Sequence, residues 1–108
     1  MWAHKRDVLR NHCESVGRDP DQIRMTWSPE IFIRATEAEI EDAGTRAIWG
    51  QSADDWRENN LVGTPQQVAE KMHTYVGLGC RGFVPWCADY PDTETLERFA
   101  TEVMPEFR

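Results

Sequence analysis

The stretch 61–86 (LVGTPQQVAEKMHTYVGLGCRGFVPW) constrains the fold most, because it begins with a complete helix start signal. Thr64 is a favourable N-cap, since its hydroxyl can accept a hydrogen bond from the first turn. Pro65 then falls at the first helical position, where its missing N–H costs nothing. Gln67 completes a Thr-x-x-Gln capping box. The sequence therefore predicts a helix that begins at Thr64.

The same stretch also contains the end of this helix and a following strand. The apolar residues of the helix recur at i, i+4, i+7 and i+8 and share one face: Val68, Met72, Tyr75 and Val76. Gly77 and Gly79 permit the left-handed residue that ends such helices. Residues 82–86 (GFVPW) are typical of a strand buried on both faces. Together they predict the helix-to-strand half of a βαβ unit.

Composition limits the class of protein. The chain has 108 residues, 40% of them hydrophobic with five Trp and four Phe, which is enough to drive the collapse of one globular unit, 1–108. Its formal charge of −7 opposes binding to nucleic acid and to anionic membranes. No apolar run is long enough to span a bilayer, and the first ten residues lack a secretory apolar core. We expect a cytoplasmic protein.

The region before this stretch predicts a helix over 4–16, ended by Gly17, and then β structure. Two β-rich runs, 23–28 and 31–33, are separated by Pro29, which removes a ladder donor. They form either two short strands or one strand broken at a bulge. We expect 23–33 and 82–86 to be parallel neighbours, joined through the helix at 64–78.

The remaining segments are predicted to be helical or irregular. Residues 37–44 form an acidic helix capped by Thr36, and 45–60 form a surface excursion with a helical turn at 53–58. A last helix begins at Asp92 or Thr93 and is stopped by Pro105.

Three groups of residues carry a family resemblance. Residues 62–65 (VGTP), 67–71 (QVAEK), Tyr75, Gly79 and 82–83 resemble the carboxyl end of luciferase-like flavin- or F420-dependent oxidoreductases. Two more stretches fit the same family in the same order: 12–23, which precedes them, and 90–105, which resembles the closing helix.

The resemblance implies a fold and an activity. The family fold is a (β/α)8 barrel of about 250 residues, so this chain would be its C-terminal portion, with two parallel strands and their helices and six strands missing. The parent would transfer a hydride to or from a small-molecule substrate through coenzyme F420, or alternatively FMN. The closing segment favours F420. We expect the isolated chain to be inactive and to self-associate, because two strands of eight leave both edges open. The alternative is a non-catalytic fragment that self-associates or docks on another barrel segment.

Candidate site residues follow from the position of barrel active sites at the carboxyl ends of strands. Trp86 could form a wall against a flat ring or substrate, although a packing role is the simpler interpretation. Asp89 could take a proton or orient a substrate hydroxyl, although its loop also leads into a helix cap. Both are candidates for the substrate pocket.

Gly63 and Thr64 are the candidate cofactor-binding residues. The helix they open would present its N-terminus at the catalytic face, where such an end can hold a phosphate. The capping box explains Thr64 without a ligand, and the resemblance implies that most phosphate contacts come from upstream strands.

The sequence indicates neither a metal site nor a catalytic pair. Cys13, Cys80 and Cys87 lack the close spacing of zinc ligands. The three histidines have no spacing that a triad or a metal requires, and the catalytic residues stay unassigned. Hydride chemistry on a deazaflavin or flavin needs no protein nucleophile.

Overall fold

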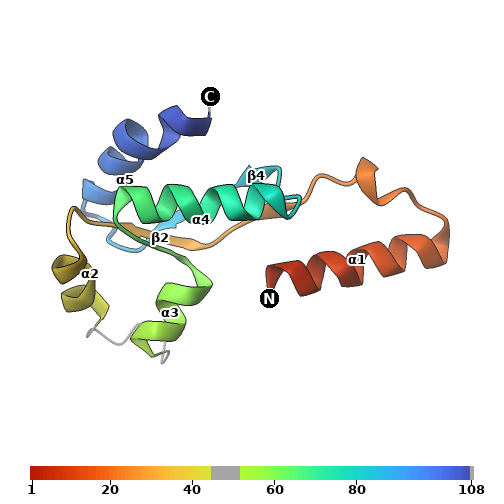
Figure 1. The fold of residues 1–108 in the computed structure, drawn as a ribbon, viewed down its shortest axis with the longest axis horizontal. Helices are drawn as coiled ribbons and strands as arrows, with labels where there is room; N and C mark the ends of the chain where they lie inside the picture. The colour runs from red at the N-terminus through yellow and green to blue at the C-terminus, as the bar shows by residue number, and fades with distance from the viewer. Residues whose placement is uncertain (45–51, 108) are drawn as a thin grey trace.

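A computed structural model describes residues 1–44 and 52–107 and has a mixed α/β architecture (Figure 1). Its helices and strands are, in chain order, α1 (Trp2–Val16), η1 (Pro20–Gln22), β1 (Thr26–Trp27), β2 (Glu30–Ile33), α2 (Glu37–Gly44), α3 (Ala53–Asn59), β3 (Leu61–Gly63), α4 (Pro65–Gly77), β4 (Gly82–Phe83), β5 (Trp86–Cys87), α5 (Glu94–Arg98), η2 (Phe99–Val103) and η3 (Met104–Phe107). No described helix has the length and apolar content needed to cross a membrane.

The strands form two small parallel sheets. One pairs β1 with β4, and the other has the order β3-β2-β5. The register places Trp27 beside Phe83 and Ile31 beside Cys87. The prediction that 23–33 and 82–86 are parallel neighbours is therefore confirmed.

Both of these strand regions are interrupted at a proline. The backbone N–H groups of Val84, Trp86 and Ala88 donate to carbonyls of the β1–β2 region, at 2.8, 3.1 and 3.0 Å. Pro29 cannot donate in return, and the Ser28 hydroxyl donates to the Val84 carbonyl instead, at 2.8 Å. The alternative of two short strands around Pro29 is the one observed.

The strand β3 was not predicted from the sequence. Its residues Leu61, Val62 and Gly63 pair with Ile31, Phe32 and Ile33. It follows β2 in the chain but lies on the side of β2 opposite β5, and the described strands do not close into a barrel. The prediction of a parallel α/β structure is confirmed. The prediction of only two strand regions is not, because β3 adds a third beside the 26–33 and 82–87 regions.

Side chains of β2 alternate between two cores. Ile31 and Ile33 pack with α4 and the C-terminal turns in a core that also contains Leu61, Val68, Ala69, Met72 and Val103. Phe32 faces the other way, into a core formed with Ile40, Ala43, Trp56 and Val62. Helices α2 and α3 therefore cover one face of β2, and α4 covers the other.

The strand at 82–86 is not buried on both faces, so that prediction was wrong. Val84 is 61% exposed and Trp86 is 51% exposed. Trp86 is paired with Glu30, which lies on the Phe32 side of β2. The helices on that side pack on Phe32 and Val62 and leave Trp86 half uncovered.

The terminal helices depart from the prediction in their extent. The helix α1 begins two residues earlier than expected and lies to one side of the sheets, with Cys13 as its buried residue (Figure 1). At the other end, α5 stops at Arg98, but helical turns continue through Pro105. Pro105 is tolerated because the first residues of a helical turn need no internal N–H donor.

Lys71 of α4 connects this helix to the end of α3. Its ammonium donates to the backbone carbonyls of Arg57 and Asn60, at 3.0 and 2.8 Å, and to that of Glu58. Burial lowers the pKa of Lys71. A cation at the carbonyl end of a helix satisfies groups that have no partner within the helix.

We predict that Lys71→Met destabilises the protein by about 2 kcal/mol, because three carbonyls lose a charged donor. Lys71→Arg should restore part of this loss. Urea unfolding provides the measurement, and Lys5→Met on the exposed side of α1 is the matched control, with an expected change within about 0.5 kcal/mol. Equal effects of the two Met variants would contradict the capping role.

Candidate functional site

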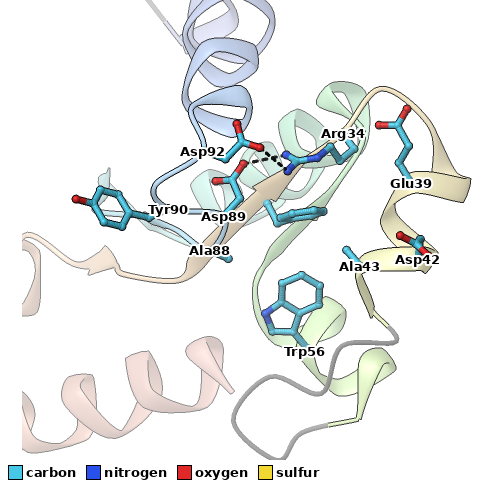
Figure 2. Close-up of a pocket in the computed structure, with 10 residues that line it drawn as sticks. Arg34, Glu39, Asp42, Ala43, Trp56, Ala88, Asp89, Tyr90 and Asp92 are labelled. Atoms are coloured by element: carbon cyan, nitrogen blue, oxygen red, sulfur yellow. Dashed lines mark hydrogen bonds and ion pairs between the residues drawn. The ribbon is translucent and has the colours of Figure 1, made fainter.

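The carboxyl ends of β2 and β5 meet at one edge of the sheet, because the two strands are parallel. Arg34 directly follows β2, and Asp89 lies two residues after β5. Beside them is a cavity of about 520 Å3 (Figure 2). Its lining residues are Phe32, Arg34, Glu39, Asp42, Ala43, Trp56, Ala88, Asp89, Tyr90 and Asp92. This volume falls in the range of small-molecule pockets.

Arg34 and Asp89 form a largely buried ion pair at this edge. Arg34 Nη1 donates to Asp89 Oδ2 at 2.9 Å, and the two side chains are 13% and 5% exposed. Thr95 links them, because its hydroxyl donates to Asp89 Oδ2 at 2.8 Å and accepts from Arg34 at 3.2 Å. The Arg34 guanidinium also lies 4.2 Å from the centre of the Phe32 ring. The loop after β5 is thus fixed to the end of β2.

The sequence did not identify Arg34. The available signal was an arginine placed directly after the buried run 31–33, at what would be the carboxyl end of a strand. Its partner lies 55 residues away. Only the register between β2 and β5 brings the two side chains together.

Asp89 acts in the structure as an acceptor for the start of α5. Besides the Arg34 and Thr95 side chains, its Oδ2 accepts the Thr95 backbone N–H at 3.2 Å. Asp92 Oδ1 accepts the Glu94 N–H at 3.0 Å, and Thr93, the N-cap residue, makes no side-chain cap bond. These contacts are of the helix-capping kind. The other oxygen of Asp89, Oδ1, is buried and has no hydrogen-bond partner among the described residues.

Trp86 lies outside this cavity. It belongs to β5 and is half exposed, next to Glu30 in the register. The two candidate pocket residues, Trp86 and Asp89, are therefore not brought together around one cavity.

Gly63 and Thr64 are occupied by the helix cap. Thr64 Oγ1 accepts the Gln67 N–H at 3.4 Å, and Gln67 Oε1 accepts the Thr64 N–H at 3.0 Å, which confirms the capping box. A Cβ at position 63 would lie 2.6 Å from Gln67 Oε1. Glycine at 63 is explained by the room that the Gln67 side chain needs to reach back to Thr64.

A carboxylate adjoins this helix start. Glu37 accepts from Gln67 Nε2 at 3.2 Å and from both terminal nitrogens of Arg57, and the Arg57 hydrogen bonds, followed by Gln67, lower the pKa of Glu37 to about 2. The group is therefore ionised near neutral pH. Arg57 also donates to Gln67 Oε1 at 3.0 Å. The polar side chains around the start of α4 are thus engaged with one another, so the geometry favours the capping role of Gly63 and Thr64.

The described residues contain no group of three or more His, Cys, Asp or Glu that could hold a metal ion. Cys13 and Cys80 are buried free thiols, and Cys87 is partly buried. Burial and the nearby charge of Asp89 raise the pKa of Cys87, which keeps this thiol protonated. His73 stacks on Phe107 at a centroid distance of 4.4 Å, away from the cavity.

Comparison with known proteins gave no match, either to a family model, to a curated protein or to a solved structure.

We predict that Thr64→Ala lowers the free energy of unfolding by about 1 kcal/mol, because the Gln67 N–H loses its acceptor. Thr74→Ala, in the middle of the same helix, is the control and should be neutral or slightly stabilising. Chemical unfolding measures both. If Thr64→Ala left stability unchanged but weakened cofactor binding by a longer protein, a ligand role would replace the cap.

The depressed pKa of Glu37 predicts a specific acid sensitivity. Its folded-state pKa of about 2 lies below the ordinary glutamate pKa of 4.5, so its contribution to stability is present above pH 4.5 and is lost as the pH falls toward 2. In this window the wild type should lose more stability than Glu37→Gln, and added salt should reduce the difference because the pair is partly exposed. The measurement is the free energy of unfolding at several pH values for both proteins. An equal loss of stability in the two between pH 4.5 and 2 would contradict the expectation.

Proposed function

We propose that this chain is the C-terminal portion of a luciferase-like oxidoreductase, in which coenzyme F420, or alternatively FMN, carries a hydride to or from a small-molecule substrate. The observation that carries the proposal is the pairing of the 26–33 and 82–87 regions as parallel neighbours with α4 between them in the chain. The last two strands of a (β/α)8 barrel are likewise parallel neighbours joined through a helix, and barrel active sites lie at the carboxyl ends of the strands. The position of β3 on the other edge of β2 and the helices on both faces of β2 differ from a barrel. A cavity is present at that end here.

The residues of this chain do not fit the phosphate of such a cofactor. The N-terminus of α4 is engaged by its own capping box and adjoins the ion pair of Glu37 and Arg57. The cavity lining adds the carboxylates of Glu39, Asp89 and Asp92, and its Arg34 guanidinium is already paired with Asp89. Phosphate contacts are therefore assigned to upstream strands, as the resemblance implies.

The second candidate function is a non-catalytic fragment that self-associates or docks on another barrel segment. Val84 and Trp86 favour it, because both are more than half exposed on one strand region. The hydrogen bonds of this region run toward β1 and β2, and its other edge has no strand partner in the described part of the chain. Unpaired strand edges with apolar side chains are templates for association.

Two experiments separate these functions. The first is to read the DNA upstream of the Met1 codon, where an in-frame continuation of about 200 codons with further βα units supports the enzyme proposal. The second is to express the continued protein and titrate it with F420 and with FMN. Binding of one of them, with loss of the cofactor absorbance change when the last 108 residues are removed, is the expected result. A continued protein that binds neither cofactor would contradict the proposal.

For the 108-residue chain alone, we predict self-association and no binding of F420 or FMN, because a ring held at the ends of the last two strands lacks most of its enclosing wall. Light scattering and cofactor titration measure this. Trp86→Ser should reduce association, whereas Tyr90→Ser, at an 85% exposed position outside the strands, is the aromatic control. A monomer that binds either cofactor at micromolar concentration would contradict the prediction.

A further inference from the structure

A second cavity lies where the start of α1, the end of α3 and the C-terminal half of α4 approach one another (Figure 1). Its volume is about 450 Å3, which also falls in the range of small-molecule pockets. Its lining combines three aromatic side chains with three polar ones, namely Trp2, Trp27 and Tyr75 with Lys5, Glu58 and Asn59. None of these six residues lines the cavity at the carboxyl ends of β2 and β5.

The three aromatic rings of this second cavity contact one another. Tyr75 stacks on Trp27 at a centroid distance of 4.0 Å, with the ring planes 18° apart. Trp2 meets Tyr75 in a T-shaped arrangement at 5.9 Å. All three side chains keep part of their surface exposed. They therefore offer a large apolar contact area to a ligand in the cavity.

Polar contacts hold the helices around this cavity in place. Trp2 Nε1 donates to the Thr26 carbonyl at 3.2 Å, next to the start of β1. Arg6 Nη1 donates to the Leu78 carbonyl at the end of α4, at 2.8 Å. On the other side of the cavity, Lys71 fixes the end of α3 to α4. The cavity is therefore formed before a ligand enters, which lowers the cost of binding.

The two charged side chains of the lining, Lys5 and Glu58, have opposite signs and do not pair. Within the described part of the chain, neither side chain makes an ion pair or a hydrogen bond with the other or with a third residue. The charge of Glu58 does act on the aromatic part of the lining, since burial raises the pKa of Tyr75, and Cys80 and Glu58 raise it further. A cavity with one unpaired charge of each sign is complementary to a ligand that carries both.

We propose that this cavity binds a free α-amino acid with an aromatic or large aliphatic side chain. The carboxylate of the ligand accepts from Lys5, and its ammonium donates to the side-chain oxygens of Glu58 and Asn59. The apolar side chain of the ligand rests against Trp2 and Trp27. A ligand with a single charge leaves either Lys5 or Glu58 without a partner. The inference concerns this cavity alone and does not depend on the oxidoreductase proposal.

The test compares phenylalanine with phenethylamine, which lacks the carboxylate, and hydrocinnamate, which lacks the ammonium. Each is titrated into the full chain at neutral pH and constant ionic strength, and indole NMR signals are followed. Phenylalanine should bind in the millimolar range and shift the signals of Trp2 and Trp27. Each single-charge probe should bind about fivefold more weakly. The indole of Trp56, outside this cavity, should not move.

Two variants assign each charge of the ligand to its partner. Lys5→Met should weaken phenylalanine binding about two- to fivefold and leave phenethylamine binding unchanged, because the amine has no carboxylate to lose contact. Glu58→Gln should weaken phenylalanine to the same extent and leave hydrocinnamate unchanged. Arg10→Met and Glu14→Gln remove one charge of each sign on α1 outside the cavity and should change none of these affinities.

Self-association of the chain is controlled by repeating the titrations with Trp86→Ser, which lies outside the cavity and should give the same affinities. Several results would overturn the proposal. One is a single-charge probe that binds as tightly as phenylalanine. Another is an equal loss of phenylalanine and phenethylamine binding in Lys5→Met. A third is the absence of any shift of the Trp2 and Trp27 indoles at about 20 mM phenylalanine.

Discussion

Burial of β2 on both faces is the constraint on which the rest of the structure depends. All four of its residues are buried, and Ile31 and Ile33 point opposite to Phe32. A strand of this kind needs a helix layer on each side, which α4 supplies on one side and α2 with α3 on the other. Its backbone also needs partners at both edges, and β3 and β5 supply them.

Polar groups join the layers around this strand. Glu30 is buried at its start, and its backbone N–H donates to Asn60 while its carboxylate accepts from the Trp56 indole at 3.0 Å. Asn60 in turn donates to the Trp56 carbonyl at 2.9 Å. At the opposite end of β3, Glu37 and Arg57 meet Gln67 of the α4 cap. The short strand β3 is thus held at both ends by side chains from α2, α3 and α4.

The strand region 82–87 is covered less completely by helices than β2 is. Its middle is exposed, whereas the loop that follows it is fixed to β2. Val84 and Trp86 are exposed in the middle of this region, where the layer formed by α2 and α3 does not reach. Beyond them the chain turns back over the sheet edge, and the Arg34 and Asp89 pair fixes it there. An apolar strand that lacks cover and a polar, well-fixed loop therefore lie next to each other. The first leaves apolar side chains exposed, and the second forms one wall of the cavity at the carboxyl ends of β2 and β5.

The sequence by itself determined the parts of this protein whose signals lie within one or two helical turns. The capping box of Thr64 and Gln67, the end of α4 before the positive φ of Gly79, and the break at Pro29 all follow from neighbouring residues. Parallel pairing of the 26–33 and 82–87 regions was also accessible, because a strand, a helix and a strand in succession favour it. Only the tertiary structure decided the place of β3, since three residues are too short to carry a pattern. It also decided the exposure of Trp86 and the meeting of Arg34 with Asp89, because both depend on strand register and on which helices cover each face, and these are set by contacts between residues far apart in the chain.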